Sequence, residues 1–126
     1  MQRDRLIKMV ICHKYLALGI VMSLLSACNH DDPSQPYIKV YKYEGSIQCD
    51  NAGVELDTMA LELINIGIDV VCSQKGHDGM VRATVCGGDT GNVNIFKINR
   101  VNFPDAESIG FESVSTLGEY QDQKCE

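Results

Sequence analysis

The residues of this chain whose types could do chemistry are its six cysteines and a His-Asp pair in a glycine-rich segment. Thiols form disulfides, ligate metal ions as thiolates or act as nucleophiles. His77 directly precedes Asp78, so the pair could act as a general base and its orienting carboxylate. The chain has no nucleophile elbow and no phosphate loop. Gly76 and Gly79 flank the pair in the pattern of a hairpin turn, which gives it a structural reason to be there.

A second acidic motif, Asp89-Thr90-Gly91, matches the short signature of aspartic proteases, in which two aspartates share a proton. In those enzymes the triplet follows a buried apolar strand, whereas here it follows Cys86-Gly87-Gly88. A turn explains the segment better. An enzyme centred on His77 or Asp89 therefore stays as an alternative, and we expect a role other than catalysis.

The first 27 residues have the composition of a secretory signal peptide. An apolar run from Tyr15 to Leu25 is closed by Ser26 and Ala27. This run is shorter than the roughly 20 apolar residues that a transmembrane helix needs. It follows a positively charged start made of Arg3, Arg5, Lys8 and Lys14.

The end of this leader, Leu25-Ser26-Ala27-Cys28, resembles the lipobox of bacterial lipoproteins. The resemblance implies that Cys28 becomes the N-terminus and carries a diacylglyceryl group and a further N-acyl chain such as palmitate. Several acyl chains anchor a protein to a membrane where one does not. The next residue is Asn29 rather than Asp, which in Gram-negative members favours the outer membrane. We therefore expect a lipid-anchored protein of the cell envelope, facing the periplasm.

The part of the chain after the leader is short and acidic. Residues 28–36 are polar with two prolines and predict a tether, and residues 37–126 make one small domain. The leader holds four of the 11 Lys and Arg and one of the 17 Asp and Glu, leaving seven basic and 16 acidic residues and a formal charge of −9. This charge argues against a nucleic-acid partner and against a polybasic membrane patch.

Four cysteines remain after Cys12 in the leader and Cys28 at the anchor: Cys49, Cys72, Cys86 and Cys125. An even number in an oxidising compartment predicts two disulfides. A zinc site in which His77 joins Cys72 and Cys86 is the competing interpretation, but the chain has no C-x-x-C pair. The missing pair also argues against a thioredoxin-like redox site. We expect neither a metal nor a cofactor.

Periodicity predicts seven elements. Apolar residues at three- and four-residue spacing from Leu56 to Ile64 predict an amphipathic helix that ends before Gly67. A shorter helix is predicted over 105–109. Alternation between turn residues predicts strands over 37–43, 68–73, 80–86, 92–99 and 111–114, with a hairpin turn at 76–79. The expected fold class is α+β, a small antiparallel-rich sheet with two helices packed on one face, in the order β-α-β-β-β-α-β.

The expected topology favours one disulfide pairing. A right-handed crossover makes the first two strands parallel neighbours, which brings Cys49 and Cys72 towards the same end of the sheet. This favours Cys49 with Cys72 and Cys86 with Cys125, and four cysteines allow three pairings in all. We expect the tail to be loose unless Cys125 ties it down.

Three short blocks resemble small exported proteobacterial proteins of unassigned function: Gly45-Ser46-Ile47-Gln48-Cys49, Gly76-His77-Asp78-Gly79 and Val85-Cys86-Gly87. In those proteins a cysteine stands directly before the second block. This chain has Lys75 there, with Cys72 three residues earlier. The resemblance implies no activity.

These observations favour a non-catalytic binding module, because binding residues gather on loops that a rigid scaffold holds. The candidate loops contain Gln48, His77, Asp78, Asp89 and Thr90. The expected partner is another envelope protein. A small inhibitor or immunity protein that blocks an enzyme or toxin with one rigid loop is the alternative.

Overall fold

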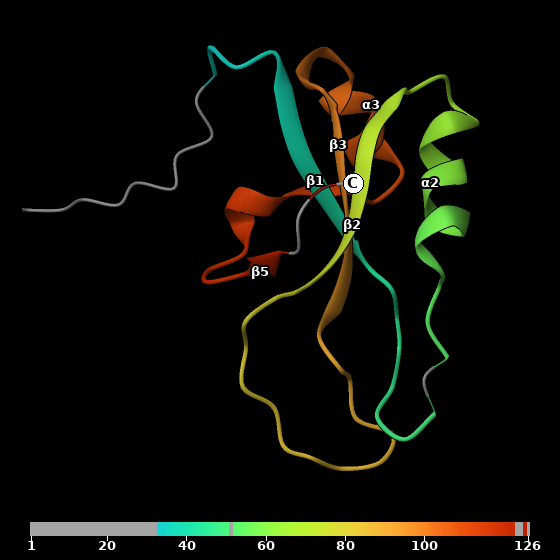
Figure 1. Cartoon of the computed structure of the whole chain (residues 1–126), viewed down its shortest axis with the longest axis vertical. Helices are drawn as coiled ribbons and strands as arrows, with labels where there is room; N and C mark the ends of the chain where they lie inside the picture. The colour runs from blue at the N-terminus through green and yellow to red at the C-terminus, as the bar shows by residue number, and fades with distance from the viewer. Residues whose placement is uncertain (1–32, 51, 123–124, 126) are drawn as a thin grey trace, which may run out of the picture.

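The computed structural model describes residues 33–50, 52–122 and 125. Its helical elements are α2 (Leu56–Ile64), η1 (Arg100–Asn102), α3 (Phe103–Ser108) and η2 (Val114–Thr116), and its strands are β1 (Tyr37–Tyr43), β2 (Val70–His77), β3 (Asn92–Asn99), β4 (Glu112–Ser113) and β5 (Gln121–Asp122). Within these residues the strands form one sheet in the order β4-β1-β3-β2-β5, and neighbouring strands run antiparallel (Figure 1). The leader, the lipobox and Cys28 lie outside the described residues.

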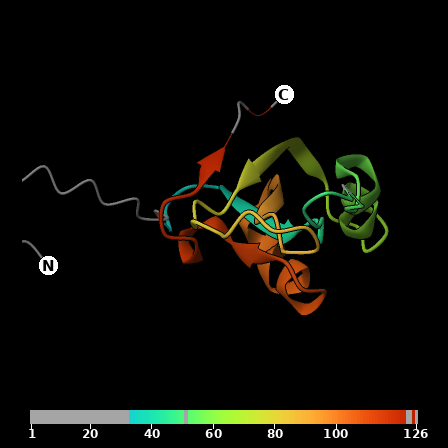
Figure 2. The same ribbon diagram turned by 90° about the horizontal axis from the view of Figure 1, so that it is seen from below.

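Both helices pack on one face of the sheet, which confirms the predicted α+β class. Alternation along β1 and β3 directs one set of side chains to this face, where Phe96 and Phe111 meet edge to face with ring centroids 5.7 Å apart. The buried core contains Ile38, Val40, Met59, Ala60, Leu63, Ile68, Phe96, Ile98, Ala106 and Phe111. Figure 2 shows α2 (green) and β5 (red) well apart, with the strands between them.

The C-terminal segment covers the opposite face. Tyr41, Val93 and Ile95 are buried there beneath Val114, and Leu117 and Tyr120 pack against them. A disulfide joins Cys72 on β2 to Cys125, with the two Cα atoms 5.6 Å apart. Cys125 therefore ties down the tail, and the tail contributes β5, which the sequence pattern did not predict.

The predicted strand over 80–86 is wrong, and so is the hairpin turn at 76–79. Gly76 and His77 belong to β2, which begins at Val70 rather than at residue 68. Residues 78–91 instead form a long connection between β2 and β3. The alternating apolar residues of this segment have nothing to pack against: Val81 is 100% exposed. An alternating pattern specifies a strand only where a partner strand and a core can receive it.

The predicted neighbouring of the first two strands is also wrong, because β3 lies between them. β1 and β2 run parallel but each pairs with β3. Cys49 follows the end of β1, whereas Cys72 stands near the start of β2, at the opposite end of the sheet. The favoured pairing is therefore corrected: Cys49 bonds Cys86, and Cys72 bonds Cys125.

Candidate binding site

Two loops leave the end of the sheet where β1 and β2 finish. The short loop (residues 45–50) comes after β1, and the long loop (residues 78–91) joins β2 to β3. We call them together the loop pair. Figure 1 shows the loop pair at the bottom, opposite the end where the described chain begins at Pro33.

The two loops are fastened to each other along their length. Gln48 N–H donates to the Gly88 carbonyl at 2.8 Å, and Gly87 N–H donates to the Gln48 carbonyl at 2.9 Å. The disulfide between Cys49 and Cys86 holds their Cα atoms 5.1 Å apart. The loop pair is therefore one cross-linked unit.

The Gln48 side chain adds a second set of bonds between the loops. Its Nε2 donates to the carbonyls of Ala83 at 3.0 Å and Asp89 at 3.2 Å. Its Oε1 accepts from Val85 N–H at 2.9 Å. Gln48, predicted as a binding residue, thus links the two loops through hydrogen bonds from both its amide nitrogen and its amide oxygen.

An ion pair shapes the long loop from within. Arg82 Nη1 and Nη2 donate to the two oxygens of Asp78 at 2.8 Å and 2.6 Å, and Nη2 also reaches Asp89 Oδ2 at 3.1 Å. Met80 N–H and the Tyr43 hydroxyl donate to the same Asp78 carboxylate, at 3.0 Å and 3.1 Å. The Asp78 side chain is 1% exposed, so these donors replace water around it.

This arrangement keeps Asp78 ionised. The hydrogen bonds from Arg82 lower the pKa of the Asp78 carboxyl well below its usual range, against the opposing effect of burial. The same contact raises the pKa of the Arg82 guanidinium. Burial, followed by the bond to Asp78, raises the pKa of Tyr43 to about 12.

His77 uses both ring nitrogens within the loop pair. Its Nε2 donates to the Thr90 carbonyl at 2.9 Å, and its Nδ1 accepts from Gly79 N–H at 2.9 Å. Asp78, which the sequence suggested as an orienting carboxylate, has Oδ1 3.6 Å from His77 Nδ1 but accepts its side-chain hydrogen bonds from Arg82 and Tyr43. These contacts favour a structural role for His77 over general base catalysis.

A buried polar network fixes the roots of both loops. Glu44, at the end of β1, accepts from Ser46 Oγ at 2.6 Å, from Lys75 Nζ at 2.9 Å and from Asn92 Nδ2 at 2.9 Å. Ser46 Oγ also contacts Thr90 Oγ1, which carries the network into the long loop. Burial disfavours the charged form of Glu44, but the three hydrogen bonds outweigh burial, so the pKa of its carboxyl is lowered.

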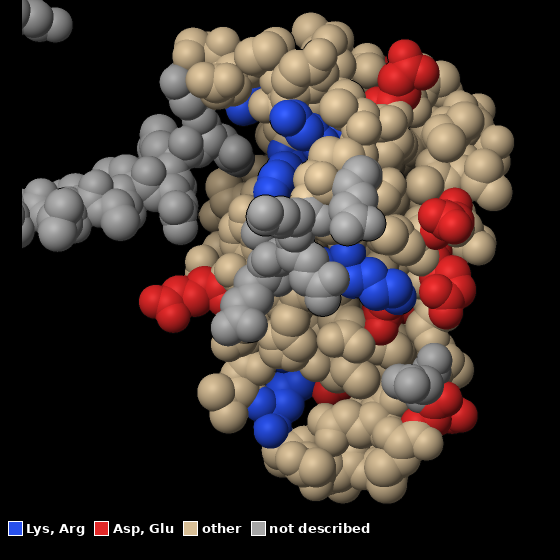
Figure 3. All heavy atoms as spheres, viewed as in Figure 1, with Lys and Arg blue, Asp and Glu red and all other residues tan. Residues whose placement is uncertain are grey.

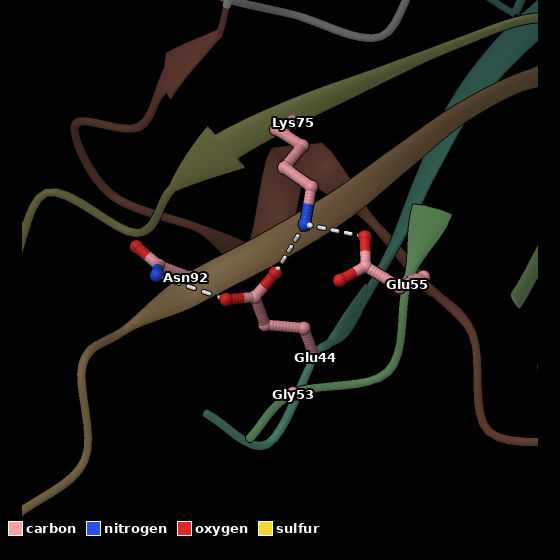
Figure 4. Close-up of a pocket in the computed structure, with 5 residues that line it drawn as sticks. All are labelled: Glu44, Gly53, Glu55, Lys75 and Asn92. Atoms are coloured by element: carbon pink, nitrogen blue, oxygen red, sulfur yellow. Dashed lines mark hydrogen bonds and ion pairs between the residues drawn. The ribbon is translucent and has the colours of Figure 1, made fainter. Parts of the chain in front are cut away.

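A polar pocket of about 230 Å³ opens beside this network (Figure 4). Lys75 stands between two carboxylates there, 2.9 Å from Glu44 and 3.8 Å from Glu55. Gly53 and Asn92 complete the lining. Lys75 and Asn92 both donate hydrogen bonds to Glu44, so the polar groups of the pocket largely satisfy one another. The pocket therefore lies where the strands connect to the loop pair.

The loop pair exposes several apolar side chains. Val81 is fully exposed, and Met80 and Val85 are each 58% exposed. Ile47 of the short loop is also exposed, and a β-bridge joins it to Asp89 of the long loop. Figure 3 shows no charged side chains at the lowest tip of this end, with Lys or Arg and Asp or Glu atoms just above it. Such a group of exposed apolar side chains on a braced support is typical of an interaction site.

All five predicted binding residues lie in the loop pair or directly beside it, and each makes hydrogen bonds there. Their contacts hold the loops together, and this is true of Gln48, His77, Asp78, Asp89 and Thr90. The sequence interpretation missed Arg82, Glu44 and the exposed valines. Arg82 stands four residues after Asp78, which is the only local signal for the ion pair.

The described residues offer neither a metal site nor a membrane span. Among residues 33–50, 52–122 and 125, no three His, Cys, Asp or Glu side chains cluster as metal ligands would. No helix of the described chain is long and apolar enough to cross a membrane. Comparison with protein families, with curated proteins and with solved structures gives no match for this chain.

Proposed function

We propose that this protein is a lipoprotein of the bacterial cell envelope, anchored through Cys28, whose domain is a non-catalytic binding module. The positively charged leader, the apolar run and the motif Leu25-Ser26-Ala27-Cys28 support the anchor. Asn29 after the anchor supports the outer membrane, with the domain in the periplasm. Two disulfides in the folded domain accord with an oxidising compartment.

One observation carries the binding role: the loop pair presents Met80, Val81 and Val85 to solvent on a support that a disulfide, the Gln48 side chain and the Asp78–Arg82 ion pair brace. Exposed apolar side chains lower the solubility of a protein, yet here the loop pair holds them in a fixed conformation. A braced loop loses little conformational entropy on binding, which favours affinity. The site lies at the far end of β1 from the tether, about 20 Å away for a seven-residue strand.

The chemistry of the surface indicates its partner. The apolar side chains need a complementary apolar depression on another protein. Asp50 and Asp89 are exposed on the same loops, and the chain after the leader carries a formal charge of −9. A partner with basic residues around an apolar depression therefore fits the loop pair best.

Inhibition of an enzyme or toxin is a second candidate, favoured by the complete exposure of Val81 on a cross-linked loop. Rigid loops of this kind can enter an active-site cleft without reorganising. An inhibitor forms a stoichiometric complex that abolishes the activity of its partner, whereas a scaffold protein leaves that activity intact.

Site-specific photo-crosslinking in the cell envelope tests the binding role. A photoreactive residue at Val81 should give one discrete crosslinked protein, and the same residue at Leu61 on the outer side of α2, which is 53% exposed, should not. Affinity capture should recover that protein with the wild type and with Leu61→Asp, and lose it with Val81→Asp. Equal recovery with Val81→Asp and Leu61→Asp would contradict a binding role for the loop pair.

A further inference from the structure

The end of the domain opposite the loop pair is formed by three chain segments that meet side by side. β1 begins there at Tyr37, β3 ends there and continues into η1, and the turn after α2 leads there into β2. Because β1, β3 and β2 are adjacent strands, their ends lie within about 10 Å across the sheet. Figure 1 shows these segments together at the top of the molecule, where the described chain also begins.

Large apolar side chains are exposed on these segments. Val101 of η1 is 78% exposed, and Ile64, Ile66 and Tyr37 are exposed to between 43% and 50%. We call Tyr37, Ile64, Ile66 and Val101 the tethered end. All four side chains are at least 43% exposed, although Lys97 of β3 lies over the Tyr37 ring. These four exposed apolar side chains at one end of the domain are available to contact an occupant.

The root of the tether is held against this end. Arg100 Nε donates to the Gln35 carbonyl at 2.9 Å, and its backbone N–H donates to the Pro36 carbonyl at 2.9 Å. Arg100 Nη2 also reaches the Tyr37 carbonyl at 3.3 Å. Gln35 follows Cys28 by only seven positions, so a fully stretched chain between them spans about 25 Å. A lipid on Cys28 would thus keep the tethered end close to the bilayer.

The charges at this end are mixed. Lys97 lies over the Tyr37 ring, with Nζ 5.1 Å from the ring centroid, and Arg100 stands beside Val101. Asp69 is exposed in the turn before β2. Figure 3 shows Lys and Arg side chains gathered on the upper part of the face. Lys and Arg at such a position suit lipid phosphates, but the apolar side chains carry the argument.

We infer that the tethered end rests on the surface of the bilayer, with Val101, Ile64, Ile66 and Tyr37 in the headgroup layer. This inference rests on the proposed lipid anchor at Cys28. Contact at this end fixes the orientation of the domain, so the loop pair points away from the membrane rather than swinging on a flexible tether. Aromatic and aliphatic side chains beside basic ones are the residues that settle at such an interface.

Two tryptophan reporters test the contact, because the chain contains no tryptophan. Val101→Trp places a single reporter at the tethered end, and Val81→Trp is the matched control at the loop pair; both valines are exposed. Each variant is expressed with its leader, purified from cells and reconstituted into vesicles of phosphatidylethanolamine and phosphatidylglycerol with acyl chains brominated near the headgroup. Circular dichroism and a thiol assay check that each variant keeps its fold and disulfides.

The expected result is about a twofold loss of fluorescence for Val101→Trp relative to vesicles without bromine, with no loss for Val81→Trp. If the protein is bound to the vesicles but bromine quenches neither reporter, the membrane contact is overturned and the anchor stands. A blue-shifted but unquenched Val101→Trp would assign the tethered end to a protein or to a second copy, and also overturn it. Protein that fails to float with the vesicles would overturn the anchor, and the contact with it.

Discussion

Arg82 closes a two-pronged ion pair on Asp78, four residues before it, with donor–acceptor distances of 2.8 Å and 2.6 Å. The contact turns the chain back on itself directly after β2. It also carries Arg82 into contact with Asp89 at the far side of the long loop. The Asp78–Arg82 pair therefore explains both why residues 80–86 do not form a strand and why the long loop keeps one shape without regular structure.

Asp78→Asn should loosen the long loop while leaving the sheet intact. The amide keeps the size of the carboxylate but loses its charge, and it gives Arg82, Tyr43 and Met80 a weaker acceptor. We expect faster hydrogen exchange at residues 78–91 and a loss on the order of 2 kcal/mol in the free energy of unfolding. Asp69→Asn, at an exposed position before β2, is the control and should change neither quantity.

Stability should fall in acid because of Glu44 and Asp78. Both carboxyls have a pKa below that of the unfolded chain, which is about 4 for Asp and Glu. Their contribution is therefore complete above about pH 4 and is lost as the pH falls through the lowered pKa values of the folded state. Urea unfolding between pH 7 and pH 2 measures this loss.

Glu44→Gln should reduce the loss of unfolding free energy between pH 7 and pH 2, since the amide cannot take up the proton. Glu55→Gln is the matched control at the rim of the same pocket, because the Glu55 side chain is 80% exposed and lies 3.8 Å from Lys75. It should leave the profile unchanged. Identical profiles for Glu44→Gln and the wild type would show that Glu44 contributes nothing to the acid dependence.

The strands over 37–43 and 92–99 could be predicted from the sequence with their observed bounds, and the helix that begins at Leu56 was also predicted, although it ends at Ile64 rather than just before Gly67. Each is specified by a local pattern whose apolar side faces the core. Met80 to Cys86 shows an equally regular alternation, yet it forms a loop, because an ion pair and a missing partner strand decide its path. Periodicity carries no information about either.

The sequence predicted in which part of the chain the candidate residues lie, but it could not predict which groups their side chains contact. Turn residues are a local signal and marked the loops at 45–50 and 87–91, whereas Gly76 lies inside β2. Whether Gln48 faces a ligand or the other loop depends on the Cys49–Cys86 disulfide, and that pairing depends on which end of the sheet each cysteine occupies. Strand order is a property of the whole chain, so neither fact could be read from spacing.

Peptide mapping without reduction should show Cys49 linked to Cys86. Trypsin and a glutamate-specific protease together separate the four cysteines into peptides 45–55, 63–75, 83–97 and 125–126. We expect 45–55 joined to 83–97, and 63–75 joined to 125–126. A link between 45–55 and 63–75 would instead restore the pairing that the sequence favoured.

Removing the two disulfides one at a time should show that each stabilises a different part of the domain. Cys72→Ala with Cys125→Ala should cost about 2 to 4 kcal/mol and release the C-terminal segment from the buried face. Cys49→Ala with Cys86→Ala should leave that face protected from hydrogen exchange and free the loop pair. Crosslinking from Val81 should then weaken only in the second double variant.

The close approach of the long loop to the C-terminal segment rests on a single glycine. Gly79 has a φ of 77°, and a Cβ atom there would come within 1.6 Å of the Glu119 carbonyl oxygen. Gly87 has a similar φ of 85°, with nothing within 4 Å of a Cβ atom. Gly87→Ala should therefore cost only the left-handed backbone conformation, about 1 to 2 kcal/mol.

Gly79→Ala should lower the free energy of unfolding by the same backbone contribution and, in addition, force residues 117–120 away from the loop pair. We expect a lower urea midpoint than for Gly87→Ala and faster exchange at the Tyr120 amide, because Tyr120 packs against the buried face beneath this segment. Since the two variants share the backbone term, the difference between them measures the contact alone. Equal midpoints would mean that the close approach of Gly79 to Glu119 contributes nothing to the stability of the domain.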